Sequence, residues 1–371
     1  MFNECSDLSQ EAQMTIRSKL GAAAAAFILI VGVPPAAQAQ LKVGFVYVGP
    51  IGDHGWSYEH NQGRLAIEKA LGDKVTTTYV EKVPEGADAQ RVISKLASSG
   101  HGLIFTTSFG YMNPTLRAAK RFPKVKFEHA TGFKRAPNMS TYSARFYEGR
   151  YVVGKIVGNM TKSNIIGYIA SFPIPEVIRG INATYLSARS VNPKVKIKIV
   201  WVSTWFDPGK EADAAKTLID QGADVIMQHT DSPAPVQVAQ RRGVWAVGQA
   251  SDMTNFGPKA HLTSIIDDWA PYYIARTRAV LDGTWKSTDT WDGFKPGMVQ
   301  MSQYNKAIPA DVVALAKKTR ADITAGRLFP FTGEIKDQSG KVRVKAGEKA
   351  NDGLLAGMNF YVQGIDGVIP K

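Results

Sequence analysis

The sequence has little cysteine, since Cys5 is the only one among 371 residues. A single thiol excludes an intrachain disulfide and a multi-cysteine metal site. Because Cys5 precedes the first apolar run, it is also in the wrong place for a lipid-modified cysteine, which would follow that run directly. We therefore expect a chain without disulfides and without a lipid anchor.

The usual motifs of catalysis are missing as well. The HExxH and GxSxG patterns are absent, and the glycine-rich stretch 49–56 fits neither GxxxxGK[ST] nor GxGxxG. His54 and His60 have the spacing of no standard metal site. We therefore expect no catalytic residues, no bound metal and no cofactor.

Long hydrophobic runs are scarce too, and none reaches the roughly 20 residues of a membrane span. The N-terminal segment instead has the parts of a secretory signal, namely a basic start, an apolar run and an A-x-A site: Arg17, Lys19, Leu20–Val33 and Ala37-Gln38-Ala39. We expect residues 1–39 to be a signal peptide, with Met14 as an alternative start, and a mature periplasmic protein from Gln40. A short N-terminal anchor is the alternative.

Charge of one sign is in excess, with a formal net charge of +13. Such an excess can indicate nucleic acid or anionic lipid as a partner. The basic residues are spread along the chain, however, and no long basic run alternates with aromatic residues. We interpret the charge as a solvated basic surface and expect no nucleic-acid partner.

From Leu41 onward, strand-like runs alternate with helix-like stretches of 10 to 15 residues. This alternation predicts βαβ units and parallel sheets. The expected strands lie at 41–48, 75–80, 102–107, 125–130, 140–146, 164–170, 195–203, 223–228 and 244–248. They form two groups of four or five, so the fold class is α/β with two doubly wound lobes.

Ligands of open α/β sheets bind beyond the carboxyl ends of the strands. The loops that follow the strands are rich in aromatic, acidic and glycine residues. Those loops supply our candidate ligand-binding residues: Asp53, Trp56, Phe109, Trp205, Asp231, Asp252 and Asp267. Two sheets that face each other across such loops predict a cleft.

The densest of these signals is the stretch from Gly49 to Trp56, between the first strand and the first helix. Its glycines allow a tight turn and close approach to a ligand. Asp53 can accept hydrogen bonds from ligand N–H groups, and Trp56 offers a flat ring for stacking. The alternative is structural, with Asp53 as a helix cap and Trp56 in the core.

A second aromatic signal ends a strand of the second lobe, in the run Trp205-Phe206-Asp207-Pro208. Asp207 followed by Pro208 has the pattern of a helix N-cap and first helical residue, so Asp207 is interpreted as structural. Trp205 or Phe206 is then the opposing stacking ring, and the other belongs to the core.

The run from Phe146 to Ile169 and its continuation over 175–193 resemble the basic membrane protein family of ABC-transporter solute-binding proteins. These proteins are relatives of the bacterial purine nucleoside receptor lipoproteins, and the resemblance covers essentially all of 41–370. It implies a periplasmic-binding-protein type I fold with two lobes, a three-segment hinge, and a ligand held between aromatic rings. Where the family's first loop has an Asn-Asp pair, this chain has Gly52-Asp53, so Asp53 is kept and the Asn is lost.

The resemblance also suggests which ligand is bound. In nucleoside-binding members an aspartate after one strand and a lysine after the next hold the ribose hydroxyls. Here Ala250 and Asp267 stand at the matching positions, and Asp252 is kept. A site without both groups has little with which to hold a ribose. We therefore expect a free purine base as the ligand, with adenine the first candidate.

These inferences together predict a monomeric periplasmic receptor that passes its ligand to an ABC permease and is not an enzyme. We expect lobe 1 to comprise 41–146 and about 250–285, and lobe 2 to comprise 147–249 and about 286–371. A purine nucleoside receptor, an exported purine nucleoside hydrolase and a sensor ectodomain subunit are the alternatives. Nucleoside turnover would distinguish the hydrolase, and a neighbouring permease gene would separate transport from sensing.

Overall fold

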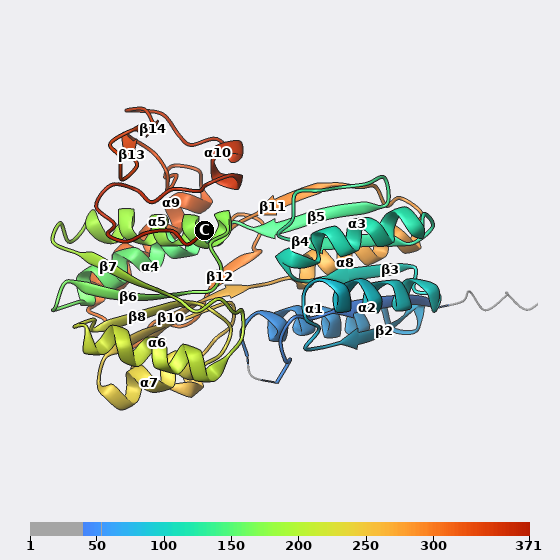
Figure 1. Ribbon diagram of the computed structural model, residues 1–371, viewed down its shortest axis with the longest axis horizontal. Helices are drawn as coiled ribbons and strands as arrows, with labels where there is room; N and C mark the ends of the chain where they lie inside the picture. The colour runs from blue at the N-terminus through green and yellow to red at the C-terminus, as the bar shows by residue number, and fades with distance from the viewer. Residues whose placement is uncertain (1–39, 53) are drawn as a thin grey trace, which may run out of the picture. The chain divides into compact units, whose positions relative to one another are not determined.

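The computed structural model describes residues 40–52 and 54–371, and Figure 1 shows that part of the chain as two groups of strands covered by helices. Within these residues there are two sheets of six strands each, and a small two-stranded sheet near the C-terminus. The expected signal peptide, residues 1–39, and the candidate Asp53 lie outside the described residues. The expectation of an α/β fold with two doubly wound sheets is confirmed.

Lobe 1 is built on a sheet with the strand order β11-β5-β4-β3-β1-β2, in which every neighbouring pair is parallel. Helices α1 and α8 pack together on one face, and α2 and α3 pack together on the other. The elements of lobe 1 are β1 (Leu41–Val46), α1 (Gly55–Leu71), β2 (Val75–Val80), α2 (Ala87–Ser98), β3 (Leu103–Thr106), α3 (Met112–Arg121), β4 (Lys126–Ala130), β5 (Met139–Ala144), α8 (Ala270–Leu281) and β11 (Asp289–Asp292).

Lobe 2 repeats this plan with the order β12-β10-β9-β8-β6-β7, where only the β10–β12 pair is antiparallel. Helices α4, α5 and α9 cover one face, and α6 and α7 cover the other. The main elements are α4 (Phe146–Met160), β6 (Ile165–Ala170), α5 (Pro175–Arg189), β7 (Lys196–Trp201), α6 (Pro208–Asp220), β8 (Val225–His229), α7 (Ala234–Arg242), β9 (Trp245–Gly248), β10 (His261–Asp267), β12 (Val299–Met301) and α9 (Ala310–Thr324).

The chain crosses between the two sheets three times, and the expected lobe boundaries need correction at two of them. The first crossover, between β5 and α4, falls near residue 146. The second follows β10, not residue 250, because His261 of β10 pairs with Ala246 of β9 in the second sheet. The third follows β11, not residue 285, because Thr290 of β11 pairs with Tyr142 in the first sheet.

After α9 the chain forms a C-terminal segment, residues 329–371, drawn in red in Figure 1. It contains β13 (Ile335–Lys336), β14 (Val342–Val344) and α10 (Asp352–Ala356). The segment lies on α5, where Arg179 donates to the backbone oxygen of Leu355 at 2.6 Å. It also reaches the first crossover, since Asp352 accepts two hydrogen bonds of 2.8 Å from Arg145. The segment therefore ties lobe 2 to the hinge.

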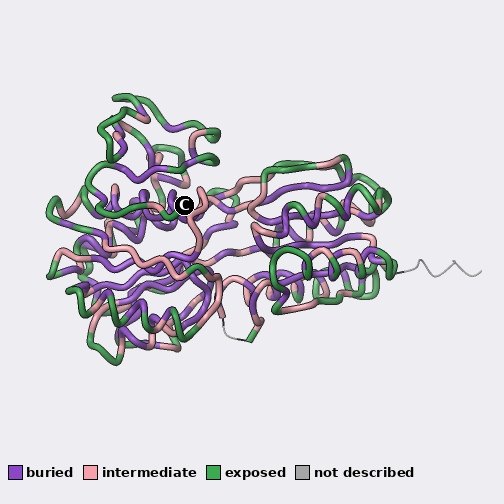
Figure 2. Tube along the Cα trace, viewed as in Figure 1, coloured by how far each residue is buried: buried purple, intermediate pink, exposed green. Residues whose placement is uncertain are grey.

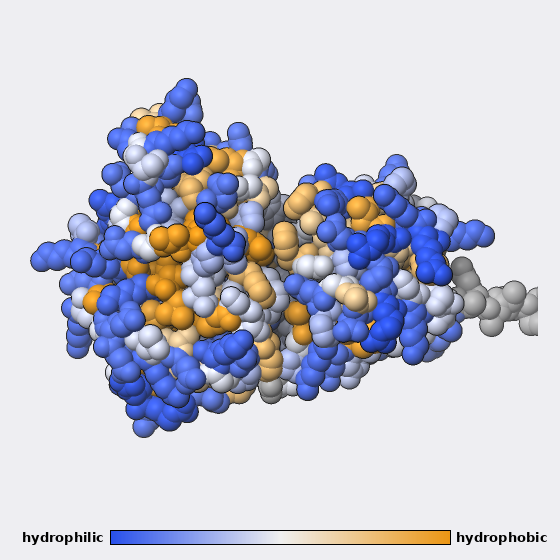
Figure 3. All heavy atoms as spheres, viewed as in Figure 1, coloured by the Kyte–Doolittle hydropathy of each residue, from blue (hydrophilic) through white to orange (hydrophobic). Residues whose placement is uncertain are grey.

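The core of each lobe lies between its sheet and its helices, and Figure 2 shows the central strands as almost continuously buried. Strands that are covered on both faces have largely apolar sequences, as in β1 and β6. On the face seen in Figure 3, hydrophilic residues cover most of the outer edge of both lobes. None of the described helices is long and apolar enough to span a membrane.

Candidate functional site

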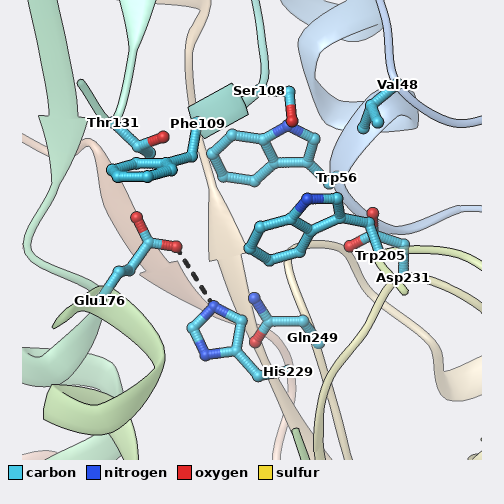
Figure 4. Close-up of a pocket in the computed structure, with 10 residues that line it drawn as sticks. All are labelled: Val48, Trp56, Ser108, Phe109, Thr131, Glu176, Trp205, His229, Asp231 and Gln249. Carbon is cyan, nitrogen blue, oxygen red and sulfur yellow. Dashed lines mark hydrogen bonds and ion pairs between the residues drawn. The ribbon is translucent and has the colours of Figure 1, made fainter. Parts of the chain in front are cut away.

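The carboxyl ends of the strands in both sheets face one pocket, which Figure 4 shows in close-up. The pocket has an empty volume of about 330 Å³, part of which is open to solvent. Ten residues line it, five from each lobe: Val48, Trp56, Ser108, Phe109, Thr131, Glu176, Trp205, His229, Asp231 and Gln249. The pocket therefore lies where parallel α/β sheets usually bind ligands.

Trp56 lies in the first turn of α1 and is held firmly in lobe 1. Its indole N–H donates to the backbone oxygen of Thr107 at 2.5 Å. Its ring meets those of His60, Phe146 and Trp269 edge-on, at centroid distances of 4.4, 5.8 and 5.5 Å. Both readings of this residue from the sequence thus have support, because the indole packs on the core and also lines the pocket.

Trp205 and Phe109 add two more rings to the pocket. Trp205 belongs to the loop between β7 and α6, and its ring contacts Phe172 at 5.1 Å. Phe109 begins a short 3-10 turn between β3 and α3. In the view of Figure 4 the indoles of Trp56 and Trp205 lie one above the other, with the ring of Phe109 to one side. A flat, apolar ligand would find aromatic surface on several sides.

Two buried aspartates provide the strongest polar signal. Asp231 follows β8, and its backbone N–H donates to the backbone oxygen of Trp205 at 2.9 Å. Burial raises the pKa of the Asp231 carboxyl well above its usual range, and the charge of Glu211 raises it further, while the backbone N–H of Trp56 lowers it. The neutral form of the carboxyl, which both donates and accepts, is therefore favoured.

Asp267 ends β10 and is fully buried. Neither of its carboxyl oxygens has a hydrogen-bond partner among the described residues. Burial raises its pKa well above the usual range, the charges of Glu59 and Glu176 add to the rise, and Arg150 opposes it. A buried carboxyl without a partner carries a free-energy cost of about 1–3 kcal/mol, which a hydrogen-bonding ligand would relieve.

The remaining polar lining comes mostly from lobe 2. Glu176, at the start of α5, lies 3.2 Å from Nε2 of His229, as the dashed line in Figure 4 marks. Burial lowers the pKa of His229, which favours its neutral imidazole. Gln249 accepts a hydrogen bond from Arg150, a fully buried side chain on α4 whose guanidinium lies 5.4 Å from the ring of Tyr168. These groups offer a ligand both donors and acceptors.

The structure brings four of the seven candidates into one pocket, namely Trp56, Phe109, Trp205 and Asp231. Asp267 does not line the pocket directly but is electrostatically coupled to Asp231. Asp252 is not in the lining, and its carboxylate instead accepts from the backbone N–H and the hydroxyl of Thr254, at 3.0 and 2.5 Å.

Six lining residues were not among the seven candidates drawn from the sequence: Val48, Ser108, Thr131, Glu176, His229 and Gln249. Five of them fall within or at the edge of loops that follow strands, and Glu176 lies just beyond one, at the start of α5. Only their position after a strand could have identified these residues, and position alone is a weak indication because polar residues commonly follow strands. Asp207, read as structural, is indeed the N-cap of α6 and accepts from the backbone N–H of Lys210 at 3.0 Å.

Among residues 40–52 and 54–371, no cluster of three or more His, Cys, Asp or Glu side chains could hold a metal ion. Two parallel α/β sheets joined by three crossovers, with an aromatic-lined pocket between them, are the arrangement typical of solute-binding proteins.

Comparison with known proteins assigns the family. The family described as "ABC transporter substrate-binding protein PnrA-like" matches residues 40–328. A purine-binding protein of Brucella abortus is 59% identical over 335 residues, which cover 90% of this chain and 95% of that protein. A Haloferax volcanii protein, provisionally named an ABC transporter glucose-binding protein, is 37% identical over 91% of this chain and 83% of its own length.

Solved structures agree on the fold. A solute-binding protein of an ABC transporter system from Aeropyrum pernix superposes with a TM-score of 0.67 at 19% identity, covering 80% of this chain and 93% of that one. The fold is therefore that of the periplasmic binding proteins. The chain belongs to the PnrA-like family of ABC transporter substrate-binding proteins, the family that the sequence resembles.

Proposed function

We propose that this protein binds a free purine base between its lobes, with adenine as the preferred ligand, and delivers it to an ABC permease. The observation that carries the proposal is the pocket itself, which combines the indoles of Trp56 and Trp205 with a buried carboxyl, Asp231. Stacking on an aromatic side chain is worth about 1–3 kcal/mol per base. Two stacking faces with two or three hydrogen bonds would give a dissociation constant on the order of micromolar or tighter.

The relatives support a purine. The Brucella abortus protein carries the name of a purine-binding protein, and its identity of 59% extends over nearly the whole chain. The Haloferax volcanii protein carries the name of a glucose-binding protein, but at 37% identity it is more distant. The nearer relative therefore weighs more in the choice of ligand class.

The state of the carboxyls favours adenine among purines. A neutral carboxyl donates through its O–H and accepts through its C=O. The amino edge of adenine presents an N–H donor beside a ring nitrogen acceptor, and so complements a neutral carboxyl. The corresponding edge of guanine presents two N–H donors, and so complements an ionised carboxylate. Because burial favours the neutral form of Asp231, which lines the pocket, adenine is the better match.

The missing ribose contacts favour a base over a nucleoside. Ala250 and Asp267, the positions that correspond to the ribose-holding pair, lie together, since the backbone N–H of Asp267 donates to the oxygen of Ala250 at 2.9 Å. The resemblance to nucleoside-binding members implies that a methyl group and an acid stand here in place of their aspartate and lysine. Ala250 also has a φ of 61°, an unusual backbone conformation for alanine that tends to occur at functional sites.

A purine nucleoside is the second candidate, because a neighbouring cavity offers room for a sugar. This cavity holds about 700 Å³, part of it open to solvent, and shares Phe109, Thr131 and Glu176 with the pocket. A base bound between the indoles could extend a substituent in that direction.

The receptor role follows from the family, whose members work outside the cytoplasm. We propose a monomer exported to the periplasm by the segment 1–39, without a lipid anchor and without catalytic activity. Ligand binding would favour the closed arrangement of the lobes, and the permease would distinguish closed from open forms.

Isothermal titration tests the ligand. The protein is unfolded and refolded to remove carried-over ligand, and is then titrated with adenine, guanine, adenosine and inosine. Micromolar or tighter binding of adenine, with at least tenfold weaker binding of adenosine, is the expected result. Tighter binding of a nucleoside would leave the receptor function standing but contradict a free base as the ligand. If none of the four compounds bound, a purine ligand would be contradicted.

A further inference from the structure

Glu85, in the loop between β2 and α2, has hydrogen-bond partners in both lobes. Its Oε1 accepts from the hydroxyl of Ser108 at 2.5 Å and from the backbone N–H of Gly110 at 2.9 Å, both in lobe 1. The same oxygen lies 3.3 Å from the indole nitrogen of Trp205, which donates to it from lobe 2. One carboxylate therefore bridges the two lobes beside the pocket.

Lobe 1 is shaped to hold this carboxylate in place. Ser108 and Gly110 flank Phe109, whose ring lines the pocket. Gly110 leaves room for Glu85, because a Cβ atom at this glycine would lie 2.2 Å from a carboxylate oxygen of Glu85. The backbone of Gly110 is outside the positive-φ region, so a side chain at this position would meet no backbone strain and would instead have to displace the Glu85 carboxylate. The two hydrogen bonds from Ser108 and Gly110 to Glu85 therefore do not depend on lobe 2.

Trp205 is fixed in a corresponding way by lobe 2. Its backbone oxygen accepts from the N–H of Asp231 at 2.9 Å, and its ring contacts Phe172 at 5.1 Å. Its ring lines the pocket, and its N–H is directed at Glu85. If the lobes separate, the bonds from Ser108 and Gly110 remain within lobe 1, and only the bond from Trp205 breaks.

We propose that Glu85 is a positioning residue that latches Trp205 over the ligand and so slows ligand release. The inference rests on the proposed binding of a purine in this pocket. A charged acceptor forms the stronger kind of hydrogen bond, and a bond made only on closure adds to the stability of the closed form alone. Such a bond changes the dissociation rate more than the association rate.

Stopped-flow measurement of adenine release tests the latch. Glu85→Ala is expected to raise the dissociation rate about three- to tenfold, with the association rate unchanged. Glu85→Gln keeps an acceptor oxygen and should change the rate less. Asp88→Ala removes the same charge from the first turn of α2, where Asp88 pairs with Arg91, and serves as the control that leaves release unchanged.

Two further variants show whether Glu85 acts through Trp205. Trp205→Phe removes the N–H donor, so Glu85→Ala should have no additional effect in that background. Gly110→Ala should displace the carboxylate and reproduce the faster release while Glu85 stays in the chain. An unchanged release rate in Glu85→Ala, or the same increase with and without the Trp205 N–H, would overturn the latch.

A ligand-free measurement separates the latch from the identity of the ligand. Dyes on cysteines at Lys120 of α3 and Lys216 of α6, both exposed, report the separation of the lobes by single-molecule energy transfer, with Cys5→Ser as background. Glu85→Ala should lower the closed fraction before any ligand is added, and an equal closed fraction would contradict the latch. Failure of adenine to close the unaltered protein would contradict the proposed ligand alone.

Discussion

Trp56→Ala should weaken adenine binding strongly, because it removes one of the two indoles that line the pocket. The loss of one stacking face costs about 1–3 kcal/mol, which corresponds to a dissociation constant about 5- to 150-fold higher. The upper part of this range is expected, because Trp56 is held in place by its bond to Thr107 and by the ring of Trp269. A preorganised ring loses little side-chain entropy when the ligand binds.

Isothermal titration of three variants gives the comparison. Trp56→Phe keeps a smaller ring and should fall between the unaltered protein and Trp56→Ala. Trp245→Ala is the matched control, since Trp245 is a partly buried tryptophan at the start of β9, the end of the strand away from the pocket. Adenine affinity of Trp56→Ala within twofold of the unaltered protein, while the control also binds normally, would refute the stacking role.

Three other predictions concern charge. Adenine affinity should fall as pH rises, because burial raises the pKa of Asp231 and Asp267 and the ionised carboxylates lose their O–H donor. Isothermal titration over a pH series checks this, and an affinity that rises with pH would contradict it. Asp231→Asn keeps a donor and an acceptor and should bind adenine with a flatter pH dependence, whereas Asp231→Ala should bind about tenfold more weakly in the same assay. Asp352→Asn should lower the free energy of unfolding in urea by about 0.5–1 kcal/mol, since Asp352 is partly exposed. Because Arg145 holds the pKa of Asp352 below its usual 3.8, the stabilisation from this ion pair is present above pH 3.8 and is lost as pH falls through the lowered pKa. An Asp352→Asn protein as stable as the original at pH 7 would contradict this prediction.

The sequence predicts the alternating part of the fold well. Each of the nine strands expected between residues 41 and 248 is present. Central strands such as β3 and β8 are buried on both faces and so require an apolar run, which the sequence reveals. Prediction fails after residue 250, where β10 and β11 go to opposite sheets. β11 (Asp289–Asp292) is short and polar, and its place is set by pairing with β5, which lies about 150 residues earlier. Such long-range pairing leaves no local pattern.

The sequence likewise predicts only part of the candidate site. The sequence identifies Trp56, Phe109, Trp205 and Asp231 because large rings and acids are conspicuous in post-strand loops, and all four line the pocket. Asp252 has the same local appearance but bonds to Thr254. Which loop residue turns inward depends on the backbone after each strand, and this is fixed by tertiary contacts. Glu85 escaped notice because its role depends on a partner 120 residues away.

A crystal structure of the adenine complex would show directly where the ligand binds. We expect the base between the indoles of Trp56 and Trp205, with its amino edge hydrogen-bonded to the buried carboxyl of Asp231. Adenine bound elsewhere, or bound in the pocket without contact to either indole, would contradict it.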